Sequence, residues 1–272
     1  MASLAKQGIS VAAYAAYLVA QNASFRRMVF NSVRLNRVET KRFGSSEECR
    51  FLAYVFLNRH ESRSQILQDL WVNFELGEKR DGFFVEFGAT DGLVNSNTWL
   101  LESKYGWKGI LAEPNPIWHA RLASNRGAVI DHRCVYASTG EKVTFLTTDA
   151  SDPELSSIAE FADGDHFAEV RAKGHAIQVE TVSLVDLLGQ HNAPAVIDYL
   201  SIDTEGSEYV LLSRFDFSRY AINLISVEQN RRTEAKIEDL LKMQGFDRVF
   251  KEFSQWDGWY LRSELRRQGP RS

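Results

Sequence analysis

The chain has 272 residues, of which 44% are hydrophobic and 25% charged. This composition is typical of a soluble globular protein and excludes a disordered chain, a collagen-like fibre and a coiled-coil rod. The net charge of −4 argues against wholesale nucleic-acid binding. Two cysteines, Cys49 and Cys134, are too few for a disulfide framework, and we expect both to be reduced.

The N-terminal part of the chain is basic. Residues 1–64 carry a net charge of +6, whereas residues 65–272 carry −10. The basic part either lies across the acidic body or docks onto an anionic membrane or partner. Its apolar run at residues 8–20 is too short to cross a bilayer and lacks the basic leader of a signal peptide. We therefore expect a helical extension over residues 1–64, no transmembrane segment, a cytoplasmic location, and N-terminal helices available for homo-oligomer contacts.

The rest of the chain, residues 65–272, is predicted to be one α/β domain. Short apolar runs alternate with helical stretches, which is typical of a parallel sheet covered on both faces. Strands are expected at residues 83–87, 109–112, 129–135, 199–202 and 224–227, and helices at 64–75, 97–104 and 233–244, the last beginning at a Thr233 cap. Residues 247–253 and 259–262 are two further strand-like runs, separated by a turn around Asp257 and Gly258, which predicts a C-terminal antiparallel hairpin.

A glycine turn follows the first predicted strand, in GFFVEFGATDG. Glycines permit a tight turn and a close backbone approach to a ligand, although glycines after strands also form plain turns. Thr90 stands where the dinucleotide pattern needs its second glycine. Glu113, at the end of the second strand, comes 21 residues after Gly92, which is close to the spacing at which an acid binds ribose hydroxyls.

Polar side chains also follow the later strands. Asp203 is expected at the carboxyl end of its strand, where ligands bind in open α/β sheets, and Glu228 and Asn230 would emerge beside it. Three such oxygen-bearing side chains suit Mg²⁺, but they also fit a solvated acidic rim. Glu205 and Glu208 begin the next helix, where acids suit the helix dipole as well as catalysis.

These segments resemble the FkbM family of S-adenosylmethionine-dependent methyltransferases over roughly residues 64–262. The matching stretches are SQILQDLWV, FFVEFGATDG, SNTWLLE, GWKGILAEPNP, CVYASTGEKVTF and YLSIDTEGSEYVLL. The resemblance implies a doubly wound, Rossmann-like class I methyltransferase sheet with a C-terminal antiparallel hairpin. It also implies methyl transfer to a hydroxyl of a small molecule or saccharide. Residues 1–64 have no counterpart in the family.

The resemblance also implies roles for individual residues. Asn97 would reach the methionine end of S-adenosylmethionine, Cys134 would line the adenine pocket, and Asp203 would lie beside the transferred methyl group. The full set of expected cofactor contacts is Glu86, Gly88, Thr90, Gly92, Asn97, Glu113, Pro114, Cys134 and Asp203.

Methyl transfer to an alcohol requires a base or a metal ion to help remove the hydroxyl proton. The expected catalytic residues are Asp203, Glu228 and His175, with His166 as a further candidate base in the acidic stretch 149–180. The metal ligands would be Asp203, Glu228 and Asn230. Two alternatives stay open, a nicotinamide-dependent oxidoreductase and a non-catalytic cofactor-binding module whose basic extension docks a partner.

Overall fold

The computed structural model describes residues 21–35, 38, 41, 46–148, 153–162 and 168–267. The chain forms two compact units, residues 1–54 and 55–272, so the larger unit begins ten residues before the boundary expected from the sequence. The smaller unit contains helix α3 (Ala23–Leu35), and helix α5 (Glu47–Asn58) spans the boundary. Residues 8–20, expected to be helical, lie outside the described residues. Among the helices that the structure describes, none is long and apolar enough to cross a membrane.

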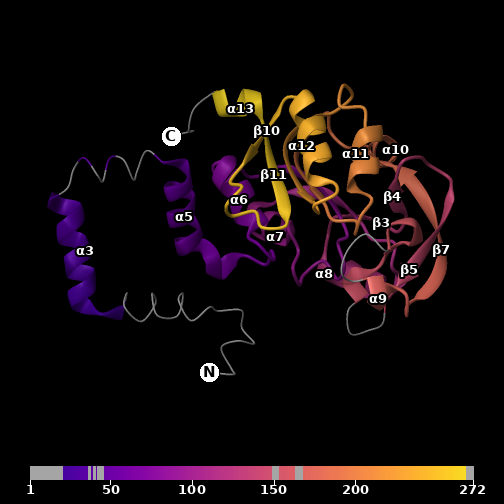
Figure 1. Cartoon of the computed structure of the whole chain (residues 1–272), viewed down its shortest axis with the longest axis horizontal. Helices are drawn as coiled ribbons and strands as arrows, with labels where there is room; N and C mark the ends of the chain where they lie inside the picture. The colour runs from indigo at the N-terminus through magenta and orange to yellow at the C-terminus, as the bar shows by residue number, and fades with distance from the viewer. Residues whose placement is uncertain are drawn as a thin grey trace. The chain divides into compact units, whose positions relative to one another are not determined.

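The larger unit is built on a seven-stranded sheet (Figure 1). Strands β1, β2, β3, β8 and β9 are parallel, whereas β11 is antiparallel to both of its neighbours, β9 and β10. From one edge to the other, the strands are β10 (Phe246–Val249), β11 (Asp257–Arg262), β9 (Ala221–Glu228), β8 (Val196–Ile202), β1 (Phe83–Phe87), β2 (Lys108–Ala112) and β3 (Val129–Asp131).

The prediction of one continuous strand at residues 129–135 is wrong. The structure divides it into β3, at the edge of the main sheet, and β4 (Cys134–Tyr136), which belongs to a second sheet. The side chain of Asp131 accepts a hydrogen bond from the backbone N–H of Arg133 at 2.9 Å. This local turn ends β3, because the backbone N–H of Arg133 bonds to a side chain and is not available to a neighbouring strand.

The turn predicted around Asp257 and Gly258 is also misplaced. The chain turns within residues 250–256, where Phe250 and Gln255 both have positive φ, and Asp257 is the first residue of β11. An Asp-Gly pair is a common turn signal, but here Gly258 is needed inside the strand. A Cβ atom on Gly258 would lie 2.4 Å from the Tyr260 ring and 2.7 Å from the Gln229 side-chain oxygen.

Helices cover both faces of the main sheet. One face packs against α10 (Leu184–Gln190), α11 (Glu208–Arg214) and α12 (Glu234–Met243), whose leucines and isoleucines share one apolar core with the strands; α11 and α12 lie side by side (Figure 1). On the other face, Trp71 of α6 (Gln68–Glu75) stacks on Trp259 with ring centroids 5.0 Å apart. This unit also contains η1 (Arg59–Glu61), α7 (Trp99–Tyr105), α8 (Pro116–Asn125) and α13 (Ser263–Arg267).

Two predicted helices differ from expectation at their first residues, whose side chains bind elsewhere. The helix predicted at 64–75 starts at Gln68, since the Ser64 hydroxyl accepts a hydrogen bond from the backbone of Asp69. Thr233 precedes α12 as predicted, but its hydroxyl accepts from the backbone N–H of Asn230 instead of capping the helix.

A second, four-stranded sheet lies between β3 and α10 in the chain. Its strand order is β4, β7 (His175–Ser183), β5 (Lys142–Thr147) and β6 (Ser157–Ile158), and it also carries the short helices η2 (Pro153–Leu155), η3 (Ala159–Phe161) and α9 (Ala168–Arg171). Cys134, Phe145, Ile158 and Val179 form its small apolar core. The acidic stretch predicted at 149–180 is therefore partly sheet, and residues 149–152 and 163–167 lie outside the described residues.

Candidate functional site

The candidate site lies at the edge of the main sheet where parallel strands β1, β2, β8 and β9 end. The turn after β1 passes close to the end of β8, because a Cβ atom on Gly88 would lie only 2.2 Å from the backbone oxygen of Asp203. Gly88, Thr90 and Gly92 all have positive φ, of 71°, 47° and 72°, which glycine adopts without strain. Gly88 is thus required both for the path of the turn and for its approach to β8.

Glu113 connects the turn to the end of β2. Its carboxylate accepts hydrogen bonds from the backbone N–H groups of Thr90 and Asn115, each at 2.8 Å. Burial raises the pKa of Glu113 to about 7, although these two hydrogen bonds favour the charged form. A carboxylate oxygen has two lone pairs, so each oxygen of Glu113 has capacity for a further donor, as two ribose hydroxyls would require. Pro114 follows directly and leads into α8.

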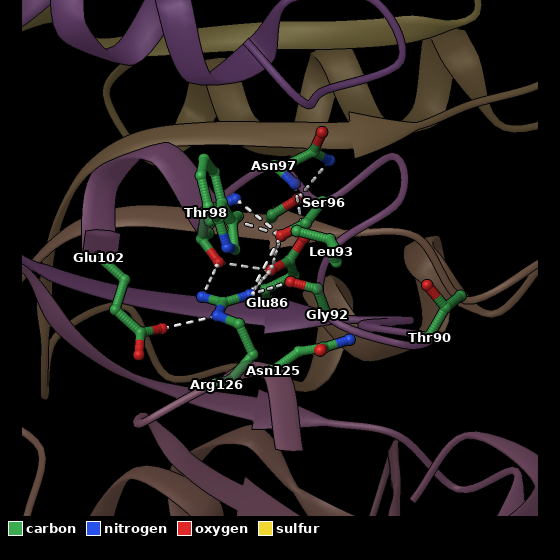
Figure 2. A network of polar contacts seen from close by, with 12 residues as sticks. Glu86, Thr90, Gly92, Leu93, Ser96, Asn97, Thr98, Glu102, Asn125 and Arg126 are labelled. Carbon is green, nitrogen blue, oxygen red and sulfur yellow. Dashed lines mark hydrogen bonds and ion pairs between the residues drawn. The ribbon is translucent and has the colours of Figure 1, made fainter. Parts of the chain in front are cut away.

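Glu86 faces a covered side of the sheet rather than the turn (Figure 2). Side chains alternate along a strand, and those of Val85 and Phe87 lie in the core beneath α10, α11 and α12. The Glu86 carboxylate accepts hydrogen bonds from the backbone N–H of Asn97 at 2.8 Å and from the Thr98 hydroxyl. We therefore assign Glu86 a positioning role, in which it holds the segment before α7 in place.

Arg126 completes this polar network (Figure 2). Its side chain is 1% exposed and lies 3.6 Å from the Glu86 carboxylate. It donates to the Gly92 carbonyl at 3.2 Å, the Thr98 hydroxyl at 2.8 Å and the Glu102 carboxylate at 2.6 Å. The network therefore fixes the end of the glycine turn and the start of α7 with respect to each other.

Asn97 carries an unsatisfied polar atom. Its side-chain nitrogen donates to the Ser201 hydroxyl at 3.0 Å, whereas its side-chain oxygen is buried and has no hydrogen-bond partner among the described residues. A buried polar atom without a partner is costly, and a ligand with a donor group would satisfy this one. Together with Glu113 and the glycine turn, this free acceptor fits the cofactor that the family resemblance implies.

Strand register places three acidic residues in one row beyond the sheet. Ile202 pairs with Val227, so Asp203 and Glu228 follow at neighbouring strand ends, and Glu228 pairs with Asp257 of β11. Asp203 and Glu228 share a hydrogen bond. Burial, and next the charge of Glu205, raises the pKa of Asp203. Burial, and next the charge of Asp203, raises the pKa of Glu228. The two carboxyl groups therefore titrate as a pair.

Two of the three metal ligands expected from the sequence, Asp203 and Glu228, come together, whereas Asn230 makes hydrogen bonds elsewhere. The side-chain oxygen of Asn230 accepts hydrogen bonds from the backbone N–H groups of Arg232 and Thr233 at the start of α12. The carboxylates that come within 4.8 Å of one another are instead those of Asp203, Glu205 and Glu228. Glu205 forms an ion pair with the fully buried Arg171, so an internal cation already neutralises one member of this group.

Two other expected site residues belong to the second sheet. Cys134 is not at the end of the third strand but at the start of β4, where it is a free, buried thiol. Burial, and secondarily the charge of Glu113, raises the pKa of Cys134 to about 12, so the thiol stays protonated. His175 is an exposed residue at the start of β7 and is not among the described side chains that gather with Asp203. His166 lies outside the described residues.

The sequence interpretation missed three residues of this region: Gln68, Asp257 and Arg171. Gln68 donates to the carboxylate of Asp257 at 3.0 Å, and burial raises the pKa of Asp257 to about 7. Arg171 donates to the backbone oxygens of Leu155 and Ala162 as well as pairing with Glu205. The only indication of this cluster in the sequence was the acidic residue Glu205, two positions after Asp203. An acidic residue at the start of a helix is equally well explained by the helix dipole.

Two solved structures of methyltransferases are similar to this chain. One is the precorrin-6Y C5,15-methyltransferase from Geobacter metallireducens GS-15, with 11% identity, a TM-score of 0.35, and coverage of 70% of this chain and 85% of that chain. The other is described as a sarcosine dimethylglycine methyltransferase from Galdieria sulphuraria, with 11% identity, a TM-score of 0.29, and coverage of 66% and 62%. No curated protein matches the chain.

A family model gives the stronger result. The methyltransferase FkbM domain matches residues 86–259, which is more than half of the chain and extends from the carboxylate of Glu86 to β11. The matched range contains β2, β3, β8, β9 and β10 of the main sheet completely, together with the end of β1 and the start of β11. The chain therefore belongs to the FkbM methyltransferase family.

Proposed function

We propose that the chain is an S-adenosylmethionine-dependent O-methyltransferase that methylates a hydroxyl of a small molecule or saccharide. Its family supports methyl transfer over the nicotinamide-dependent alternative. The strand order, with antiparallel β11 between β9 and β10, is the arrangement expected of a Rossmann-like class I methyltransferase sheet with its terminal hairpin. Family membership alone gives a methyltransferase. The identity of the cofactor, the transfer to oxygen and the catalytic residues are proposed in addition.

The residues at the ends of β1 and β2 would hold the cofactor. When bound, S-adenosylmethionine supplies a methyl group on a positively charged sulfur. In the proposed complex, Glu113 accepts hydrogen bonds from ribose hydroxyls, and the unpaired side-chain oxygen of Asn97 accepts one from the ammonium of the methionine end. The backbone of the Gly88 turn then lies against the cofactor, where any larger residue would already strike Asp203.

The observation that carries the proposal is the carboxyl pair of Asp203 and Glu228, whose oxygens come within 4.8 Å of each other beside this turn. An alcohol becomes a good nucleophile only as it loses its proton. The acceptor hydroxyl donates this proton to the carboxylate oxygen of the pair that is not protonated. Bound S-adenosylmethionine would supply the methyl group to this oxygen, with its sulfur as the leaving group. No step requires a metal ion, and His175 is too exposed to hold the acceptor.

Two measurements test the proposal in sequence. Calorimetry with the full chain should detect binding of S-adenosylmethionine and of its demethylated product. Mass spectrometry should then detect a labelled methyl group on a hydroxylated acceptor when saccharides and other alcohols are incubated with labelled cofactor. A folded chain that does not bind the cofactor would contradict the proposal. Binding without transfer to any alcohol or saccharide would support the non-catalytic module instead.

Three finer expectations stay predictions. They are the saccharide nature of the acceptor, the cytoplasmic location and the lack of nucleic-acid partners. The panel of acceptors tests the first of these directly. If the chain methylates a saccharide but not a simple alcohol, it recognises the sugar ring as well as the hydroxyl.

A further inference from the structure

Helix α3 is outside the FkbM match and has no part in the proposed reaction. Its sequence, ASFRRMVFNSVRL, contains three arginines and no acidic residue. Asn22 begins the helix, because its side-chain oxygen accepts hydrogen bonds from the backbone N–H groups of Ser24 and Phe25 at 2.9 and 3.1 Å. This is a regular N-terminal cap, so the helix has a defined start and a defined set of faces.

Apolar side chains on α3 are exposed. Phe25, Met28 and Val29 are 36%, 56% and 43% exposed, and their spacing of three and four residues places them on one face. At 100° per residue, Arg27 and Arg34 lie roughly opposite Phe25 and Val29. The helix therefore has an exposed apolar side at Phe25, Met28 and Val29 and a basic side at Arg27 and Arg34, with Phe30, 66% exposed, next to the basic side.

The charge of the surrounding segment has the same sign as the basic face. Residues 1–54 contain eight lysines and arginines against three acidic residues, whereas residues 55–272 have a net charge of −9. A basic surface attracts any polyanion, but exposed phenylalanine, methionine and valine gain nothing from a nucleic-acid backbone. A bilayer with anionic lipids offers both an apolar interior and a negative surface.

We propose that α3 binds in the plane of an anionic membrane surface. Phe25, Met28 and Val29 insert among the acyl chains, and Arg27 and Arg34 extend their long side chains to the lipid phosphates. The helix has 13 residues and is about 20 Å long, so it lies in the interface and does not cross the bilayer. The methyltransferase unit would thereby act next to a membrane surface.

Co-sedimentation of the full chain with lipid vesicles tests this proposal. We expect binding to vesicles of phosphatidylcholine and phosphatidylglycerol in equal amounts, weaker binding at high salt, and little binding to phosphatidylcholine alone. The double variant Arg27→Gln, Arg34→Gln should bind the mixed vesicles roughly 30-fold more weakly. Phe25→Ser, Val29→Ser should weaken binding at least tenfold or so while leaving the charge unchanged.

A matched control variant loses the same amount of positive charge from the larger unit instead of from α3. Arg121→Gln, Arg214→Gln removes two exposed arginines of the larger unit and should bind vesicles as the unchanged chain does. Circular dichroism and the melting temperature check that all variants are folded. Equal loss of binding in the control and in the α3 variants would overturn the proposal, because binding would then reflect total charge alone.

Three further results would also contradict it. Unchanged binding of the serine variant would mean that the apolar face does not insert. Competition by inorganic phosphate at constant ionic strength would mean that α3 binds free phosphate rather than lipid. The chain could also fail to bind vesicles and instead form a dimer in sedimentation velocity that the serine variant does not form. A second copy of the chain would then cover this face, which is the homo-oligomer contact expected from the sequence.

Discussion

The carboxylate of Glu113, at the end of β2, accepts a hydrogen bond from the backbone N–H of Thr90 at 2.8 Å, across the turn that follows β1. The acid that is proposed to bind ribose therefore also holds the turn that is proposed to receive the cofactor. A change at Glu113 acts on both, so its effects on cofactor affinity and on folding must be measured separately.

Cofactor affinity should depend on pH through Glu113. Burial raises the pKa of this carboxyl to about 7, and only the charged form accepts hydrogen bonds with both oxygens. We expect the affinity for S-adenosylmethionine to rise as pH increases through about 7, and calorimetry across this range measures it. Glu113→Gln should weaken binding roughly 10- to 100-fold and lose this pH dependence, whereas Glu180→Gln, an exposed acid of β7, should do neither.

The same raised pKa has the opposite consequence for folding. Burial favours the neutral form, so the contribution of Glu113 to the free energy of unfolding is present in full below its unfolded value of 4.5 and is lost as pH rises through about 7. Denaturant unfolding of the unchanged chain and of Glu113→Gln measures this difference. A variant with the same pH profile of stability as the unchanged chain would contradict the assignment.

Replacing either member of the carboxyl pair should stop transfer without preventing cofactor binding. Asp203→Asn and Glu228→Gln remove the group that accepts the proton, and we expect kcat to fall roughly 10²- to 10⁴-fold. Cofactor affinity, measured by calorimetry, should change little. Asp216→Asn, an exposed carboxyl, is the matched control. Full activity in both pair variants would exclude proton removal by this pair.

Gly88 should tolerate no side chain. An alanine there would have a Cβ atom 2.2 Å from the backbone oxygen of Asp203, at a φ of 71°. Gly140→Ala is the control, since Gly140 has a φ of 84° and nothing within 4 Å of such an atom. We expect the control to lose about 1–2 kcal/mol in the free energy of unfolding and Gly88→Ala to lose about 1–3 kcal/mol more. Equal losses would show that the turn can move away from β8.

Arg171 should be important for stability although it lies far from Glu205 in the sequence. Its side chain is 0% exposed and pairs with Glu205, and breaking a buried pair from one side costs about 3–5 kcal/mol. Arg171→Met should cost that much in denaturant unfolding, and Arg171→Met, Glu205→Gln should cost less. Lys251→Met removes an exposed pair with Glu238 and should cost under about 1 kcal/mol. A small loss in Arg171→Met would mean that the pair is not formed in solution.

Chelation should leave turnover unchanged. Asn230, one of the three predicted ligands, accepts hydrogen bonds at the start of α12, and the buried Arg171 pairs with Glu205 beside the other two. Dialysis against EDTA followed by the labelled-methyl assay measures this. Loss of turnover that Mg²⁺ restores would bring the metal site back.

The strands of the main sheet could be predicted from the sequence where burial alone determines them. The run at 83–87 is buried on both faces and is β1 to the residue. The run at 129–135 looked equally continuous, but Asp131 binds its own backbone and the chain changes sheets. The pattern of apolar residues indicates which residues are buried, but it does not indicate which sheet a strand joins.

The site was predictable where a residue acts at its own strand end. Glu113 and Asp203 follow their strands directly, and the structure places both at the edge that the turn occupies. Asp257 joins the row only through its register with Glu228, and Gln68 only through a hydrogen bond across 189 positions. Such pairings depend on tertiary structure, so no local pattern could indicate them.

The ion pair of Arg171 with Glu205 also limits how members of this family can be recombined. The four-stranded sheet that carries Arg171 looks like a module that could be exchanged to change acceptor choice. A chimera that receives this module from another member without a matching partner for Glu205 would bury one charge alone beside Asp203. Successful exchange therefore requires the arginine and the glutamate to be transplanted together.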